Sequence, residues 1–109
     1  MAYDEKLDER IKKIVSGWKG MSSKKMFGGV CHLLNGNMVG GVYKDMLILR
    51  LGVEKAEKFL KKKHFVYFDI TGRPMKGWVM AKPGAFKTDD KLRALLEQAK
   101  AFAGTLPRE

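Results

Sequence analysis

The sequence is poor in several residue types that define large classes of protein. Its 109 residues include one cysteine, two histidines and three prolines. A single cysteine forms no internal disulfide and fits a reducing compartment, and two dispersed histidines lack the spacing of a metal site. No apolar run approaches the roughly 20 residues of a membrane helix, and the acidic start at residues 1–5 is unlike a signal peptide. We therefore expect a cytoplasmic protein with no metal, no cofactor and no membrane partner.

What the chain does have is a large excess of positive charge and enough apolar residues for a core. Lysine and arginine total 22 against 12 acidic residues, which gives a formal net charge of +10. Hydrophobic residues make up 45% of the chain, which excludes wholesale disorder. At this length we expect one domain over residues 1–109.

Three segments have apolar residues at helical spacing, namely residues 4–18, residues 53–63 and a last segment that begins after Thr88 and ends before Pro107. Asp4 and Thr88 are expected N-caps, and the acidic residues early in each segment suit the helix dipole.

Five segments are predicted to be strands: residues 26–34, 37–43, 46–51, 65–70 and 75–81. Tight turns at residues 35–36 (Asn-Gly), residues 44–45 and residues 71–74 join neighbouring strands. The predicted order is α-β-β-β-α-β-β-α. It indicates an α+β fold of two layers, with helices on one face of a mostly antiparallel five-stranded sheet.

The predicted turns also set the register of the strands. Two-residue turns at 35–36 and 44–45 place Leu34 opposite Asn37, Cys31 opposite Gly40 and Val42 opposite Leu47. A turn at residues 72–73 would place Tyr67 opposite Trp78 and Asp69 opposite Lys76.

Alternation along these strands puts a second apolar set, including Met46, on the face away from the helices. An exposed apolar face of this kind is typical of a surface for a partner protein, and we expect a homodimer or another protein partner there. The alternatives are that a loop or terminus covers the face, or that the register is off by one. The candidate interface residues are Val30, Val39, Ile48, Arg50, Phe65, Tyr67, Trp78 and Met80.

Candidate catalytic chemistry is sparse. Cys31 and His32 are neighbours on a predicted strand, so their side chains point to opposite faces and cannot act as a nucleophile–base pair. We expect a structural role for Cys31 and assign no catalytic residue. A small-ligand site or an enzyme remains an alternative, and His32, Arg50 and Tyr43 are the one polar group that shares a predicted face.

Two glycine pairs, at residues 28–29 and 40–41, lie on paired strands. Glycine inside a strand marks a bulge, a bend or a close backbone approach. A phosphate-binding loop would need these glycines in a turn before a helix. Close packing of a helix or of a partner over the glycines is therefore favoured over a small-molecule site.

The positive charge also supports direct nucleic-acid binding as an alternative function. Lysine-rich surfaces are often only solvated, and no known nucleic-acid motif is present. The candidate contacts are Lys24, Lys25, Lys61, Lys62, Lys63, Arg73 and Lys76.

Four motifs together resemble one family: MFGG at residues 26–29, LLNGNM at 33–38, TGRPMKGW at 71–78 and AFAGTLP at 101–107. The chain is similar to the N-terminal domain of the competence regulator TfoX (Sxy) and, more narrowly, it resembles the short stand-alone bacterial proteins built from that domain alone.

The resemblance implies a secretion-chaperone-like α+β fold, a tendency to dimerise and no known catalytic residues. Full-length regulators are thought to act as transcriptional coactivators with a cyclic-AMP receptor protein, and they carry a second, helical domain. This chain ends where that domain would begin. We therefore expect a non-enzymatic interaction or regulatory module, with a protein partner in transcription regulation.

Overall fold

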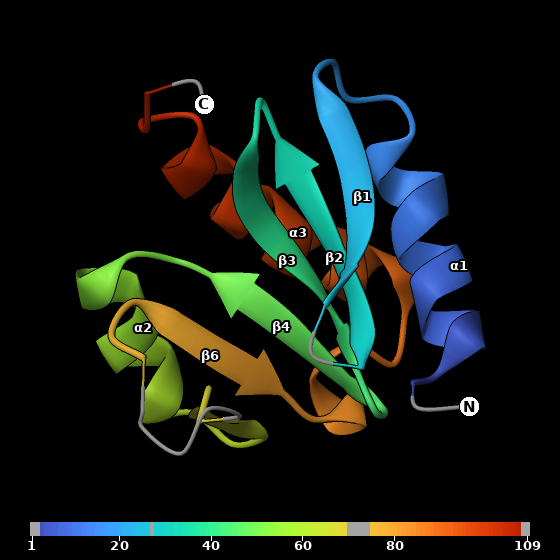
Figure 1. The fold of residues 1–109 in the computed structure, drawn as a ribbon. Coiled ribbons are helices and arrows are strands. Elements are labelled where there is room, and N and C mark those ends of the chain that lie inside the picture. The colour runs from blue at the N-terminus through green and yellow to red at the C-terminus, as the bar shows by residue number, and fades with distance from the viewer. Residues whose placement is uncertain (1–2, 27, 70–74, 108–109) are drawn as a thin grey trace.

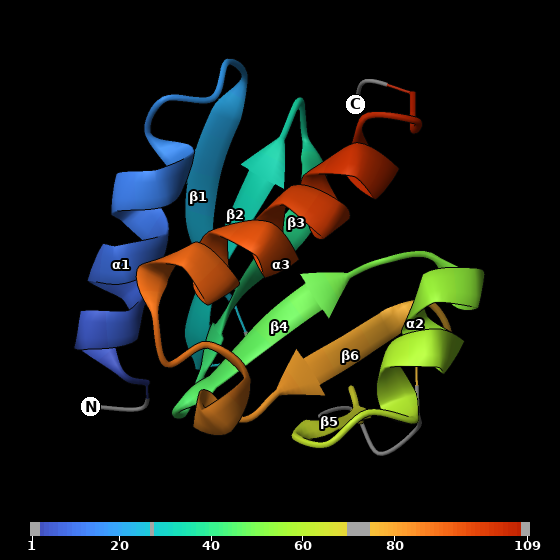
Figure 2. The same cartoon turned by 180° about the vertical axis from the view of Figure 1, so that it is seen from behind.

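The computed structural model describes residues 3–26, 28–69 and 75–107. It is an α+β fold in which three α-helices lie on one side of a six-stranded sheet (Figures 1 and 2). The elements are α1 (Glu5–Val15), β1 (Met21–Met26), β2 (Gly29–Leu34), β3 (Asn37–Tyr43), β4 (Met46–Arg50), α2 (Val53–Leu60), β5 (Phe65–Tyr67), β6 (Trp78–Ala81), the short 3-10 helix η1 (Pro83–Ala85) and α3 (Asp89–Ala103).

The α+β class is confirmed, but the predicted five strands are one too few. The order is α-β-β-β-β-α-β-β-α, because residues 21–26 form a strand that the sequence did not predict. This segment reads MSSKKM and has no apolar alternation, since β1 is an edge strand and residues 22–25 are exposed. Backbone pairing with β2 defines it, and Gly28, with a φ of 77°, lies in the connection between the two strands.

The sheet order is β1-β2-β3-β4-β6-β5, and the named strands pair antiparallel. The predicted turn at residues 35–36 is confirmed: Asn35 and Gly36 have φ values of 51° and 87°, and Leu34 lies opposite Asn37. Positive φ at both positions is what a tight hairpin requires. The turn at 44–45 is also confirmed, with Val42 opposite Leu47 as predicted.

The helices begin where the sequence predicts. The Asp4 carboxylate accepts hydrogen bonds from the backbone amides of Lys6 and Leu7 at 2.9 and 3.2 Å, and the Thr88 hydroxyl accepts from Lys91 at 3.2 Å. These caps satisfy amides that have no partner inside a helix. The middle helix, α2, ends at Leu60, earlier than the predicted residue 63.

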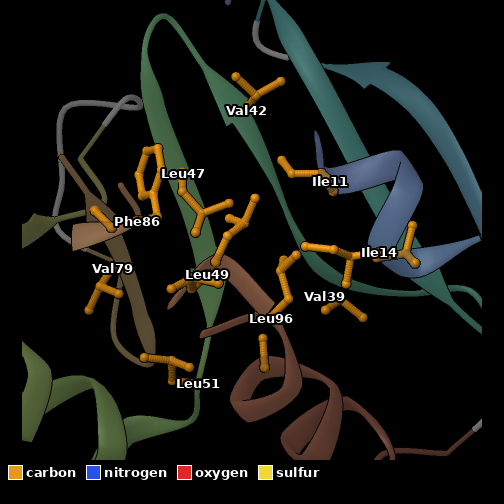
Figure 3. Packing of buried hydrophobic residues seen from close by; sticks show 14 of the residues in the cluster. Ile11, Ile14, Val39, Val42, Leu47, Leu49, Leu51, Val79, Phe86 and Leu96 are labelled. Atoms are coloured by element: carbon orange, nitrogen blue, oxygen red, sulfur yellow. The ribbon is translucent and has the colours of Figure 1, made fainter. Parts of the chain in front are cut away.

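The main core lies between the helices and the sheet (Figure 3). Ile11 of α1 and Leu96 of α3 point toward strand residues such as Val42 and Leu49, and all four are at most 1% exposed. Burial of this apolar surface is the main favourable term in folding.

Candidate functional site

The face of the sheet away from the helices, here called the helix-free face, differs from the predicted one because of a β-bulge. The register between β2 and β3 shifts between His32 and Leu33, so Cys31 lies opposite Gly41 and not opposite Gly40. The prediction that Val30 and Val39 are exposed there is therefore wrong. Both belong to the core under the helices and are 5% and 1% exposed. One extra residue on a strand reverses the facing of everything beyond it.

The pairing of β5 with β6 also differs by one residue from the predicted register. Tyr67 pairs with Val79, one position away from the predicted Trp78. Phe65 consequently packs against the core on the helix side, and Tyr67 points the same way with half of its side chain exposed. The predicted pairing of Asp69 with Lys76 is also wrong: among the described residues neither belongs to a strand or an ion pair, and both are exposed. The predicted turn at residues 71–74 lies outside the described residues.

A small second core lies on the helix-free face. Ile48, Met80 and Phe68 are 1%, 5% and 1% exposed. Phe68 follows β5 and packs edge-on against Trp78, with ring centroids 5.4 Å apart, and its carbonyl accepts a hydrogen bond from the Met75 amide at 3.0 Å. The alternative that a loop covers part of this face is therefore confirmed. Ile48 and Met80 are on the predicted face but buried.

Partly exposed apolar side chains surround this second core. They come from β3, β4, β5, β6 and the segment that precedes β6, and most of them were not among the candidate interface residues. Their signal in the sequence was the apolar alternation, which the bulge and the shifted register obscured. They are Met38, Tyr43, Met46, Val66, Met75 and Trp78.

Arg50 links the helix-free face to the helix layer. Its guanidinium carbon lies 5.3 Å from the centre of the Trp78 ring and 5.7 Å from that of the Phe102 ring in α3. Cation–π contacts of this kind hold a charged side chain against aromatic surface. Arg50 is half-buried, so it is a polar member of the face, as predicted.

His32 does not join Arg50 and Tyr43, because the bulge turns it toward the helices. Its Nε2 lies 2.9 Å from Oδ1 of Asp8 in α1, and both side chains are buried. A carboxylate only accepts, so Nε2 carries the donated proton. Lys12 binds the second carboxylate oxygen at 3.1 Å, which raises the pKa of its ammonium group. His32, Arg50 and Tyr43 therefore do not lie on one face, and the small-ligand site suggested for them is not formed.

Cys31 is 1% exposed, so its predicted burial is confirmed. Its predicted side of the sheet is wrong, because its strand neighbours Val30 and His32 face the helices. Burial raises the pKa of its thiol, an effect that Lys24 partly offsets. A buried thiol with a raised pKa is a poor nucleophile.

Three of the four glycines in the two pairs lie close to the backbone of a neighbouring strand, namely Gly29, Gly40 and Gly41. A Cβ at Gly41 would meet the carbonyl oxygen of Val30, and one at Gly29 would meet the carbonyl oxygen of Val42. The bulge that the glycines indicated is present. For Gly29 and Gly41 the close contact is backbone against backbone, so no helix is needed to explain them, and packing of a partner over them stays a prediction.

The basic candidates are separated in the fold. Lys24 and Lys25 are exposed on β1 at one edge of the sheet. Residues 61–63, also exposed, follow α2 and precede β5 at the other edge. Lys76 is exposed before β6, and Arg73 lies outside the described residues. The described lysines therefore form no single patch.

The described residues contain neither a candidate metal site nor a helix that could span a membrane. No group of three histidine, cysteine or acidic side chains there could hold a metal ion. None of the helices in that part of the chain combines the length and apolar character that crossing a membrane requires.

Comparison with known proteins confirms the resemblance seen in the motifs. Residues 13–103, nearly the whole chain, match the TfoX N-terminal domain. This is a regulatory rather than a catalytic family. No curated protein and no solved structure shows significant similarity to the chain. The chain belongs to the TfoX N-terminal domain family.

Proposed function

We propose that the protein is a non-enzymatic interaction module with a regulatory role linked to transcription, and that it pairs with a second copy of itself through the helix-free face. The observation that supports this proposal is the set of partly exposed apolar side chains around Ile48, Phe68 and Met80. The transcription link comes from family membership.

The composition of this face fits an interface. Methionine, tyrosine, tryptophan and arginine are enriched where proteins meet, and lysine and acidic residues are depleted. Here Tyr43, Met46 and Trp78 lie around the buried centre, with Arg50 beside Trp78. Phe68 covers the buried centre, but the surrounding side chains stay partly exposed to water. A partner would bury these side chains further.

The test is sedimentation velocity on the wild type and on Met46→Glu. Met46 is half-buried on the helix-free face, so a carboxylate there would be desolvated in a dimer but reach water in the monomer. We expect a wild-type dimer and a monomeric variant with an unchanged circular dichroism spectrum. Val53→Glu is the matched control, because Val53 is an apolar residue that is 54% exposed on α2. This control should remain a dimer.

Two outcomes would contradict the proposal. A wild type that stays monomeric at high concentration removes self-pairing. A dimer that Met46→Glu and Val53→Glu weaken equally places the interface elsewhere. Ile48 is unsuited to this experiment, because at 1% exposure a charge there would unfold the monomer.

A further inference from the structure

A groove lies on the helix side of the sheet, opposite the proposed dimer face. Here called the α2–α3 groove, it has a volume of about 470 Å³. Its walls come from the end of α2, the segment that leads into β5, η1 and the first half of α3, which surround one region of the fold in Figure 2. The lining residues are Phe59, Lys62, Lys63, Phe65, Gly84, Ala85, Lys91, Ala94 and Leu95.

The groove exists because the two helices pack on different strands. The shorter helix, α2, packs against β5 and β6, whereas α3 packs against β3 and β4. A hydrogen bond of 2.6 Å from Lys55 to Gln98 connects the two helices. Gly84 lets the His64 ring pack closely against η1, since a Cβ there would come within 2.5 Å of that ring.

The floor of the groove is apolar and only partly covered. Phe59 and Phe65 form an edge-to-face pair with centroids 5.1 Å apart. Together with Ala85 and Leu95 they pack against the main core and remain half-buried. An apolar side chain seated on them would remove this surface from water.

The rim of the groove is positively charged. Lys62, Lys63 and Lys91 are exposed, and the lining residues include no acidic side chain. Lys62 holds its ammonium group 4.5 Å from the centre of the Phe59 ring, directly beside the floor. A ligand with an apolar group flanked by negative charges would match both features.

We propose that the α2–α3 groove binds a segment of a partner protein in which apolar side chains are flanked by acidic residues. The groove is nearer to an open surface than to an enclosed cavity, so it would leave much of a free small molecule in water. An extended peptide can bury its apolar side chains there and keep its backbone at the surface. A duplex fits less well, because phosphate contacts need no apolar floor. A single strand would need an open aromatic face for its bases to stack on, and Lys62 lies over the Phe59 ring.

This second proposal is independent of the dimer, since the groove and the helix-free face lie on opposite sides of the sheet. The experiment is selection from a random-peptide phage library on the immobilised wild type. We expect the enriched peptides to combine leucine or aromatic residues with glutamate or aspartate. The affinity of the best peptide is then measured by fluorescence polarisation for the wild type and each variant.

Two pairs of variants separate the groove from general electrostatics. Lys62→Glu/Lys91→Glu should weaken binding at least about tenfold. The control is Lys61→Glu/Lys87→Glu, which has the same net charge and changes exposed positions outside the groove. The affinity of this control should stay within about twofold of the wild type. Ala94→Glu should also weaken binding at least about tenfold, and Ala101→Glu, an exposed position of the same helix outside the groove, should not.

Three results would overturn the proposal. The first is a selection that enriches no acidic–apolar pattern. The second is an equal loss of affinity in the groove variants and their controls, which would indicate charge attraction alone. The third is a single-stranded oligonucleotide that binds more tightly than the peptide and depends on Lys62 and Lys91, which would make the groove a nucleic-acid surface.

Discussion

At the scale of single residues, Gly41 shows how one missing side chain sets the sheet geometry. It is buried in β3 opposite Cys31, and the Val30 carbonyl occupies the place where a Cβ would project. Because the blocking atom belongs to the backbone of β2, it cannot move without disturbing the pairing of the two strands. The close approach of β2 and β3 at this position therefore depends on glycine.

We expect Gly41→Ala to lower the free energy of unfolding by at least about 2 kcal/mol, measured by urea denaturation with tryptophan fluorescence. The added methyl group would force β2 and β3 apart. Gly17→Ala is the matched control, because nothing lies within 4 Å of its added Cβ, and its effect should stay below about 1 kcal/mol. Equal destabilisation of both variants would contradict this account of the close approach between β2 and β3.

At the scale of elements, the contact between α1 and β2 rests on a buried polar pair as well as on apolar packing. Asp8 receives a hydrogen bond from His32 and an ion pair from Lys12. Removal of one member of a buried pair leaves the other without its partner, which costs more than removal of both. The pair therefore determines the position of α1 on the sheet, and its net contribution to the free energy of unfolding is small.

A double-mutant cycle tests this reading of the pair. We expect His32→Leu to cost about 3 kcal/mol, because the Asp8 carboxylate stays buried with only Lys12. The double variant Asp8→Leu/His32→Leu should lose at least about 1 kcal/mol less than the sum of the two single variants. Additive losses in urea denaturation would show that the two residues act separately.

The elements also show which parts of the fold a single sequence predicts. The turns at residues 35–36 and 44–45 are determined locally, so the pairings next to them were predicted correctly. The edge strand β1 and the bulge after His32 depend on pairing between strands, which leaves no periodic signal. Each one-residue shift in strand pairing moves the side chains of that strand to the opposite face of the sheet. Hence Val30, Val39 and Phe65 were placed on the wrong side, while Ile48, Trp78 and Met80 were placed on the right one.

At the scale of the whole molecule, the net charge of +10 is spread over separate regions. The lysines of β1 and those of residues 61–63 are associated with opposite edges of the sheet. A nucleic acid that recognised a site would need contacts from one continuous surface. The distribution instead favours attraction without recognition.

We therefore expect titrations with single- and double-stranded oligonucleotides to show weak binding that falls steeply with salt and shows no preference for sequence or strand type. Lys24→Glu/Lys25→Glu and Lys61→Glu/Lys63→Glu should weaken this binding by similar factors, because each pair removes the same charge. Binding that one pair abolishes and the other leaves intact would point to a specific site and revive the nucleic-acid alternative.

The attachment of the chain ends has a mechanical consequence. The Asp4 amide donates to the Lys44 carbonyl at 2.7 Å, just after β3, and the Asn37 side chain at the start of β3 donates to the Pro107 carbonyl at 2.7 Å. The two ends therefore meet opposite ends of one central strand (Figure 1). Tension applied through them would first meet these single hydrogen bonds, which would break one at a time and release the terminal segments. The pairing of β3 with β2 and β4 would be loaded only afterwards, and its cross-strand bonds, which lie perpendicular to a load along the strand, would share that load.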